Sequence, residues 1–342
     1  MAKKHNIRVI LDPLDSWEGY PEWMRGDMFA DERILEGQEF ILEEFGKRYK
    51  DEPAIFAYDL INEPTVSSGW SPVVKEKFGE WVRKKYRNEK TLKKYWIDYP
   101  FARETWETIK IPASYPNPGN RRLYDFQIFR EEVAANWVKR LSAALKRYDT
   151  RHFLTVGLVQ MSAPLYRLVH NQNFGIFGYP AFNPQKIAPY VDYMSIHGYD
   201  WWDDKEEYFL EGVVRYAYVG KPVILEEFRF VKRYIDHLVG STSGWLNWSA
   251  FWVGSIRWLY NLREDRVTDA GIEFKEKASQ LTFFTMDRKP PVDYVIVDRL
   301  ALLTNITYAE ELYFRYLDKR FKSGGPIDFR FINDDLPVEY EE

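Results

Sequence analysis

Short runs of apolar residues recur along the chain and are separated by stretches with helical periodicity. Each run is almost continuously apolar rather than alternating, which is typical of parallel strands that are covered on both faces. The runs are Ile7–Leu11, Ala54–Ile61, Phe153–Val159, Val191–Ile196, Pro222–Leu225 and Leu246–Val253. Amphipathic stretches lie between them, among them Ile34–Tyr49, Leu123–Tyr148 and Asp204–Tyr218. This alternation predicts an α/β fold with right-handed crossovers.

Two segments depart from the simple alternation. The connection over residues 65–123 is long and contains a charged helical piece, Val73–Tyr95, followed by a loop rich in Pro, Gly and Asn. After Pro290 the pattern predicts a strand at Tyr294–Val297, a helix at Tyr308–Phe321 and a strand at Ile327–Ile332. We therefore expect a barrel-like domain over residues 1–289 with an insertion at about 65–123, and a βαβ tail over residues 290–342.

Length and composition narrow the class of protein. The 342 residues fit one (β/α)8 barrel of about 250 residues plus an extension. The net charge of −4 argues against a nucleic-acid groove, and no apolar run reaches the roughly 18–20 residues of a membrane-spanning helix. The absence of Cys excludes disulfides, zinc–thiolate sites and cysteine nucleophiles. Residues 1–11 contain no secretion-signal pattern, and the compartment is left open.

Aromatic residues are the unusual part of the composition. The chain has 13 Trp, 24 Tyr and 23 Phe, together 18% of its residues. Tyr and Trp combine a flat apolar face with a polar edge, a combination that suits a sugar ring as well as a protein core. The composition alone supports both interpretations equally.

Candidate chemistry lies where two of the predicted strands end. The predicted strand at Ala54–Ile61 leads into Asn62-Glu63 before Pro64, and the predicted strand at Pro222–Leu225 leads into Glu226-Glu227. Because the carboxyl ends of barrel strands form the active-site face, these acids are expected to meet there. Cleavage of a glycosidic bond needs one protonated and one ionised carboxyl group. Burial would raise the pKa of the acid, and hydrogen bonds would keep the other group charged.

Together these residues resemble the glycoside hydrolases of clan A, most closely family five, the cellulase and mannanase family. Residues 59–64, Asp-Leu-Ile-Asn-Glu-Pro, resemble the fourth strand of that family, and residues 222–228, Pro-Val-Ile-Leu-Glu-Glu-Phe, resemble the seventh. The resemblance implies that Glu63 is the acid/base, that Glu227 is the nucleophile and that the anomeric configuration is retained. Strand parity agrees, because it places Leu225 and Glu227 on one face and Glu226 on the other.

Further matches follow in the same order. Residues 191–199 resemble the sixth strand, which implies that His197 and Tyr199 lie near the nucleophile. Residues 245–249 resemble the eighth strand, whose Trp lies beneath the sugar that is cleaved. We take this residue to be Trp248, with Trp252 as the alternative. Asn62 would bind the sugar 2-hydroxyl group.

Other polar and aromatic residues are open to two interpretations. Trp17, Trp201 and Trp202 are stacking platforms for sugar or ordinary packing residues. Asp59 lies deeper in the barrel than Glu63, where a buried salt bridge is favoured over catalysis. Asp12 and Asp15 are loop caps or sugar contacts. We expect no metal site, because the histidines outside the predicted site lack ligand spacing; they are His5, His152, His170 and His237. No glycine-rich phosphate loop follows a strand, so no nucleotide cofactor is expected.

The match begins at the third strand of the family, with Ile7–Leu11, so two strands and the second-strand Arg that supports the nucleophile are missing. In one hypothesis the tail completes the barrel as a circular permutation and Arg330 supplies the missing charge. In the other, the chain is a segment of a longer protein. The insertion at 78–86 and the tail at 333–337 resemble family forty-two β-galactosidases, in which a flavodoxin-like domain follows the barrel.

The leading hypothesis is a retaining β-glycoside hydrolase that acts on β-linked glucan or mannan by double displacement, without a cofactor. The long insertion could close one end of a cleft, so an exo-acting, β-galactosidase-like enzyme is the alternative. A carbohydrate-binding pseudoenzyme and a structural module are the other classes considered. The expected partner is an oligo- or polysaccharide, with no nucleic acid and no membrane, and a homo-oligomer is left open.

Overall fold

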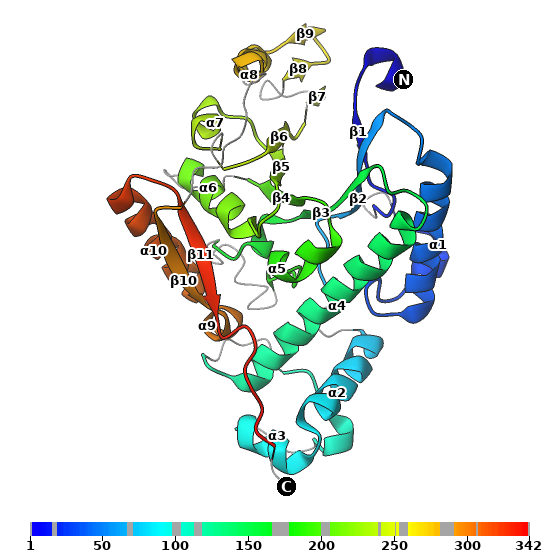
Figure 1. Ribbon diagram of the computed structural model, residues 1–342, viewed down its shortest axis with the longest axis vertical. Coiled ribbons are helices and arrows are strands. Elements are labelled where there is room, and N and C mark those ends of the chain that lie inside the picture. Colours follow the sequence, from blue (N-terminus) through cyan, green and yellow to red (C-terminus); the bar gives the residue numbers. More distant parts are fainter. Residues whose placement is uncertain are drawn as a thin grey trace.

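Six parallel strands form one sheet that curls into a half-barrel, and they are ordered in space as they are in the sequence. The strands are β1 (Val9–Leu11), β2 (Ile55–Asn62), β3 (Phe153–Leu158), β4 (Met194–Gly198), β5 (Val223–Phe228) and β6 (Gly244–Asn247). In Figure 1 they follow an arc that is open between β6 and β1. This confirms the predicted fold class, a (β/α) barrel without its first two strands.

The computed structural model describes residues 2–15, 19–66, 71–97, 104–112, 118–165, 178–199, 206–238, 241–249, 251–252, 259–280, 291–305 and 307–340. None of the helices within these ranges is both long enough and apolar enough to cross a membrane.

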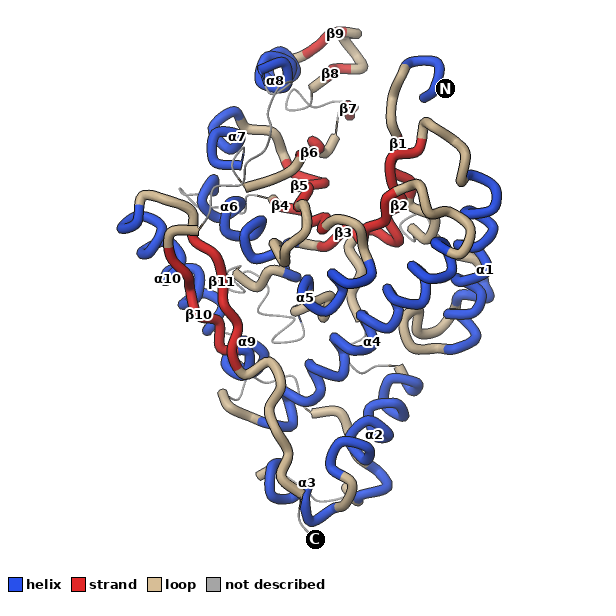
Figure 2. Tube along the Cα trace, in the orientation of Figure 1, coloured by secondary structure: helices blue, strands red, loops and turns tan. Residues whose placement is uncertain are grey.

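Helices cover the outer side of the arc (Figure 2). They are α1 (Glu32–Tyr49), α4 (Arg121–Lys146), α5 (Pro184–Ile187) and α6 (Glu206–Ala217). The side chains of Asp31 and Asn120 accept backbone N–H groups at the starts of α1 and α4, as N-cap residues do. Trp137 Nε1 of α4 donates to Gln38 Oε1 of α1 at 2.9 Å, and this bond joins the two helices. With one face covered, the strands present their carboxyl ends along a single edge.

The predicted strand Leu246–Val253 is divided in the structure. Only β6 belongs to the main sheet, while β7 (Phe251–Trp252) pairs with β8 (Tyr260–Asn261) in a small sheet that also contains β9 (Arg266–Val267). The helices α7 (Lys232–Leu238) and α8 (Asp269–Gln280) complete this region.

The predicted helix Val73–Tyr95 is two helices, α2 (Pro72–Tyr86) and α3 (Glu89–Tyr95). The helix α2 ends before Arg87, whose φ of 67° is not helical. Asn88 then caps the start of α3, because its side chain accepts the N–H of Thr91 at 2.8 Å. Both helices pack near the start of α4, where the buried Asp125 carboxylate accepts Trp96 Nε1 at 2.7 Å. The described part of the insertion therefore contains two helices that pack near the start of α4.

The tail lies against the outer face of α6 (Figure 1). It consists of β10 (Asp293–Asp298), α9 (Arg299–Thr304), α10 (Tyr308–Ser323) and β11 (Ile327–Ile332). Within the described ranges β10 and β11 pair only with each other, and Tyr216 of α6 contacts the rings of Phe329 and Phe331. The tail adds no strand to the six-stranded sheet. Arg330 stacks on Tyr294 within this outer pair instead of reaching the mouth of the barrel.

A buried ion pair joins the tail to the barrel helices. Glu131 of α4 and Arg299 of α9 form this pair with no exposed side-chain surface on either residue. The same carboxylate accepts Tyr179 Oη at 2.8 Å and Asn183 Nδ2 at 3.1 Å. These neutral donors satisfy the remaining oxygen lone pairs, so the charge can be buried without a large penalty.

Replacing Glu131 with Ala removes the buried counter-charge of Arg299 and leaves only the half-exposed Asp334 carboxylate, 3.2 Å from Arg299 Nε, as its acidic partner among the described residues. We expect the free energy of unfolding to fall by about 3–5 kcal/mol, measured by denaturant titration. The control is Asp318→Ala, which breaks an exposed pair with Lys322 and should cost less than about 1 kcal/mol. Equal losses in the two variants would contradict this account.

Candidate active site

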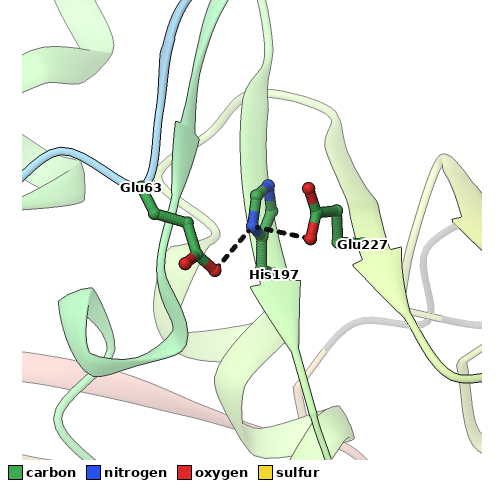
Figure 3. A group of neighbouring side chains, drawn as sticks. All are labelled: Glu63, His197 and Glu227. Carbon is green, nitrogen blue, oxygen red and sulfur yellow. Dashed lines mark hydrogen bonds and ion pairs between the residues drawn. The ribbon is translucent and has the colours of Figure 1, made fainter. Parts of the chain in front are cut away.

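Three strands bring Glu63, His197 and Glu227 together at the mouth of the half-barrel. Figure 3 shows the imidazole of His197 between the two carboxylates. His197 Nδ1 lies 2.9 Å from Glu63 Oε1 and 3.6 Å from Glu227 Oε2. One carboxylate oxygen of Glu63 lies within 4.8 Å of one carboxylate oxygen of Glu227. The imidazole is 1% exposed and the carboxylates are 25% and 17% exposed, so the acids face a partly open space above a buried base.

Tyr199 orients the Glu227 carboxylate. Its Oη donates to Glu227 Oε2 at 2.7 Å, while its backbone N–H donates to Gln160 Oε1 at 2.6 Å. The structure therefore brings His197 and Tyr199 beside Glu227, where the family resemblance places them.

The other predicted binding residues are distributed around this centre. Asn62 is the last residue of β2 and directly precedes Glu63. Trp248 follows β6, and its side chain is 49% exposed. Trp17, Trp201 and Trp202 lie outside the described residues, as does the side chain of Trp252.

The backbone of Glu63 has an unusual conformation. Its φ of 46° is in the left-handed region, which costs a non-glycine residue of order 1–3 kcal/mol. The next residue, Pro64, disfavours the right-handed helical region for Glu63. The N–H of Glu63 donates to Gly157 O at 2.9 Å, which holds the carboxylate at the strand end.

A β-bulge in β5 changes the direction of Glu226. The register with β4 runs from Leu225, opposite Ile196, to Glu227, opposite His197, so Glu226 is an extra residue. Ser195 and His197 share a face of β4, and Ser195 Oγ donates to Glu226 while His197 contacts Glu227. Both glutamates therefore reach the same side of the sheet. The parity prediction that Glu226 faces away is wrong, because a bulge interrupts the alternation.

Asp59 lies below the two catalytic candidates. Its Oδ1 accepts the N–H of Gly157 at 2.7 Å, and no Lys or Arg side chain pairs with it among the described residues. The buried salt bridge predicted for Asp59 is therefore wrong. Gly157 makes this approach possible, since a Cβ there would lie 2.4 Å from Asp59 Oδ2 and 3.1 Å from His197 Nε2.

The surroundings of Glu227 raise its pKa. Burial is the main cause, and the charges of Glu63 and Asp15 add to it, while His197 and the hydrogen bond from Tyr199 lower it. The sequence led us to expect a raised pKa for the acid and not for the nucleophile. The structure shows that burial outweighs the two stabilising neighbours at Glu227.

Asp12 acts as a loop cap in the structure. Its Oδ1 accepts the N–H of Leu14 at 3.3 Å. Burial, and after it the charge of Asp15, raises the pKa of Asp12 to about 7. Asp15 is exposed and close enough to Glu227 to affect its pKa.

Glu63, His197 and Glu227 each offer one atom with the chemistry of a metal ligand, all within 4.8 Å of one another. The imidazole nitrogen among them is already the partner of Glu63, at 2.9 Å. We interpret the group as a hydrogen-bonded acid–base cluster.

Two features of this site were not predicted from the sequence. Gln160 fixes the backbone of Tyr199, and no motif marks it. Gly157 interrupts the apolar run of β3, and a glycine inside a strand is a recognised sign of a close approach by another group. That signal could have indicated a crowded position next to Glu63 and His197.

Comparison with solved structures identifies the class of fold. A β-galactosidase from Rahnella sp. R3 superimposes with a TM-score of 0.74 at 14% identity, covering 96% of this chain and 55% of that one. The half-barrel is thus the fold of a barrel glycoside hydrolase.

Comparison of sequences identifies the family. A family model described as β-galactosidase, glycoside hydrolase family 42, matches residues 29–228, and the chain belongs to this family. It is 25% identical over 193 residues to β-galactosidase Pbg of Clostridium perfringens, covering 53% of this chain and 26% of that protein. It is 30% identical over 82 residues to a probable mannan endo-1,4-β-mannosidase F of Aspergillus flavus, covering 21% and 18%. The matches confirm the resemblance to clan A, with features of families five and forty-two. They also span well under two thirds of these curated relatives.

Substituting Gly157 with Ala places a methyl group against Asp59 and His197. We expect the imidazole ¹⁵N signals of His197 to shift and the melting temperature to fall. Gly244→Ala is the matched control, since a Cβ there meets nothing nearer than 3.8 Å. If Gly157→Ala left both the His197 signals and the melting temperature unchanged, the close approach would be wrong.

Proposed function

We propose that the chain carries the catalytic centre of a retaining β-glycosidase, with Glu63 as the acid/base and Glu227 as the nucleophile. The observation that supports this is the separation of the two carboxylates, whose nearest ligand oxygens lie within 4.8 Å. Retaining enzymes hold these groups about 5–5.5 Å apart, whereas inverting enzymes need about 6.5–9.5 Å to admit a water molecule.

In the first step Glu63 donates its proton to the glycosidic oxygen as the bond from that oxygen to the anomeric carbon breaks. Glu227 attacks the same carbon from the opposite face and forms a glycosyl ester. Tyr199 Oη, at 2.7 Å from Glu227, holds the attacking carboxylate in place. In the second step the Glu63 carboxylate takes a proton from water, the water oxygen bonds to the anomeric carbon, and Glu227 is released.

His197 acts as the bridge between the two acids in this proposal. Its Nδ1 is within hydrogen-bond distance of Glu63 and near Glu227. A donor at this position stabilises whichever carboxylate is ionised at a given step. The proton on Glu63 and the charge on Glu227 can therefore alternate without movement of the backbone.

The substrate we propose is a β-linked glucan or mannan. The mannanase relative and the half-exposed Trp248 at the end of β6, which offers a flat apolar face, support a polysaccharide. An exo-acting β-galactosidase is the second candidate, because the family model and the relative from C. perfringens are both described as β-galactosidase. The presence of both acids with their hydrogen-bond partners argues against a pseudoenzyme.

Substituting Glu227 with Ala should abolish hydrolysis of aryl β-glycosides, and added azide should restore turnover with an α-glycosyl azide as the product. Azide then takes the place of the missing nucleophile. In Glu63→Ala, azide should instead yield a β-glycosyl azide, with a loss of about 10²–10⁴-fold without azide. Glu276→Gln, on the exposed side of α8, is the control. Wild-type rates in Glu227→Ala would refute the assignment.

The activity should decrease on the acidic side as the pH falls through the raised pKa of Glu227, because the nucleophile must be ionised. Tyr199→Phe removes a hydrogen bond that lowers this pKa. The acidic limb of the pH profile of kcat/KM should then move upward by about one to two pH units, since a hydrogen bond to a charged group contributes about 1.5–3 kcal/mol. A limb that stayed in place or moved downward would show that Tyr199 does not stabilise the ionised Glu227.

Polymeric mannan and cellulose should be hydrolysed faster than nitrophenyl β-galactoside under matched conditions. Reducing-sugar release and nitrophenol absorbance measure the two rates. The opposite ranking would favour the exo-acting β-galactosidase.

A further inference from the structure

A second layer of polar groups lies directly below the catalytic candidates, on the same face of four adjacent strands. Asp59 of β2 covers Gly157 of β3, and Gly157 is in register with Ser195 of β4. Ser195 Oγ donates to Glu226 of β5. Two carboxyl groups therefore lie at one level inside the half-barrel, with only a glycine and a serine between their strands.

This layer has no counter-charge of its own. Asp59 is 7% exposed, and the described residues include no Lys or Arg that pairs with Asp59 or Glu226. Two buried carboxylates without a cation would carry a large desolvation penalty, and a shared proton lowers this penalty by neutralising one of the two charges. Burial, and after it the charge of Glu226, accordingly raises the pKa of Asp59, and burial raises that of Glu226.

An unpartnered hydroxyl group provides an independent observation. Tyr193 directly precedes β4, two residues before Ser195, and is 4% exposed. Its Oη has no hydrogen-bond partner among the described residues. Its pKa is raised by burial and then by the charges of Glu226 and Asp59, which places the hydroxyl group close to both acids. A buried donor that faces an acidic pair is suited to bind the one negative charge that remains when the pair holds a proton.

We propose that Asp59 and Glu226 form a carboxyl–carboxylate pair that holds one proton between them and acts as a positioning pair beneath Glu227. Ser195 donates its hydroxyl group to Glu226, and the unpartnered hydroxyl group of Tyr193 lies near the pair as a second potential donor. The layer thus carries one negative charge and not two. Its effect on the nucleophile rests on the proposed function, but the shared proton itself does not.

The charged and titratable groups around the pair come from the ends of β1 and β4 and from β5. The strand β3 contributes Gly157 and Thr155, and β6 contains no titratable residue. Asp12, after β1, faces Asp59. Tyr193 just before β4, His197 of β4 and Glu227 of β5 face Glu226. His197 is the only base in this set, so it is shared between the catalytic layer and the layer below.

The test is the proton uptake on folding, obtained from the pH dependence of the free energy of unfolding between about pH 5 and pH 7.5. Unfolded Asp and Glu release their protons near pH 4, so a proton held only by the folded pair makes stability fall as the pH rises. The variants are Asp59→Asn, Glu226→Gln and the double variant, with Glu276→Gln as the exposed control.

A shared proton predicts that Asp59→Asn takes up one proton fewer than the wild type, because the Ser195 hydrogen bond and His197 favour the ionised form of the remaining Glu226. In Glu226→Gln burial still disfavours ionisation of Asp59, so that variant loses one proton at most. The double variant should show the same loss of one proton and no more. A loss of two protons in the double variant would mean that each acid holds its own proton, and no loss in any variant would mean that both are ionised. Either result overturns the proposal. If the double variant does not fold, the single variants still decide whether a proton is lost.

The second measurement concerns catalysis. The double variant removes the negative charge below Glu227, so the acidic limb of kcat/KM should move to lower pH, an effect that a loss of packing alone would not produce. If the acidic limb of the pH profile stayed in place while the double variant lost one proton, the positioning role would be overturned. The shared proton would still stand. Failure of the proposed function would instead appear as an absence of activity in the wild type.

Discussion

The contact of one imidazole nitrogen with two carboxylates is the interaction on which this site depends. His197 Nδ1 lies 2.9 Å from Glu63 and 3.6 Å from Glu227, although the three residues come from different parts of the chain. Only the parallel arrangement of β2, β4 and β5 brings their ends to one edge. The outer helices cover this sheet, and the buried pair of Glu131 and Arg299 joins α4 to the tail.

An excess of acid over base characterises the inner face of the half-barrel. Glu63, Glu227, Glu226 and Asp59 surround a single histidine, and the pKa values of the last three are raised by burial. In such surroundings Tyr199 and His197 favour the ionised form of Glu227, because both lower its pKa. The shared proton proposed for the lower layer acts in the same direction, because it reduces the negative charge close to Glu227.

The sequence predicted the order of the six strands, the βαβ pattern of the tail and the meeting of Glu63 with Glu227, since these depend on hydrophobic periodicity and on where strands end. It did not predict the direction of Glu226, because alternation assumes a regular strand and the bulge in β5 depends on pairing with β4. The prediction of a salt bridge at Asp59 was wrong for a related reason. Burial can be inferred from a sequence, but the partner of a buried charge depends on which residues face it in the folded chain.

The assignment of Glu227 as the nucleophile is the central claim, and its neighbour Glu226 is the competing residue. Trapping with a 2-deoxy-2-fluoro glycoside that bears a good leaving group, followed by peptide mass spectrometry, tests it most directly. The account predicts a single glycosyl ester on Glu227. An ester on Glu226 or Glu63, or turnover in which no ester accumulates and the product is inverted, would contradict it.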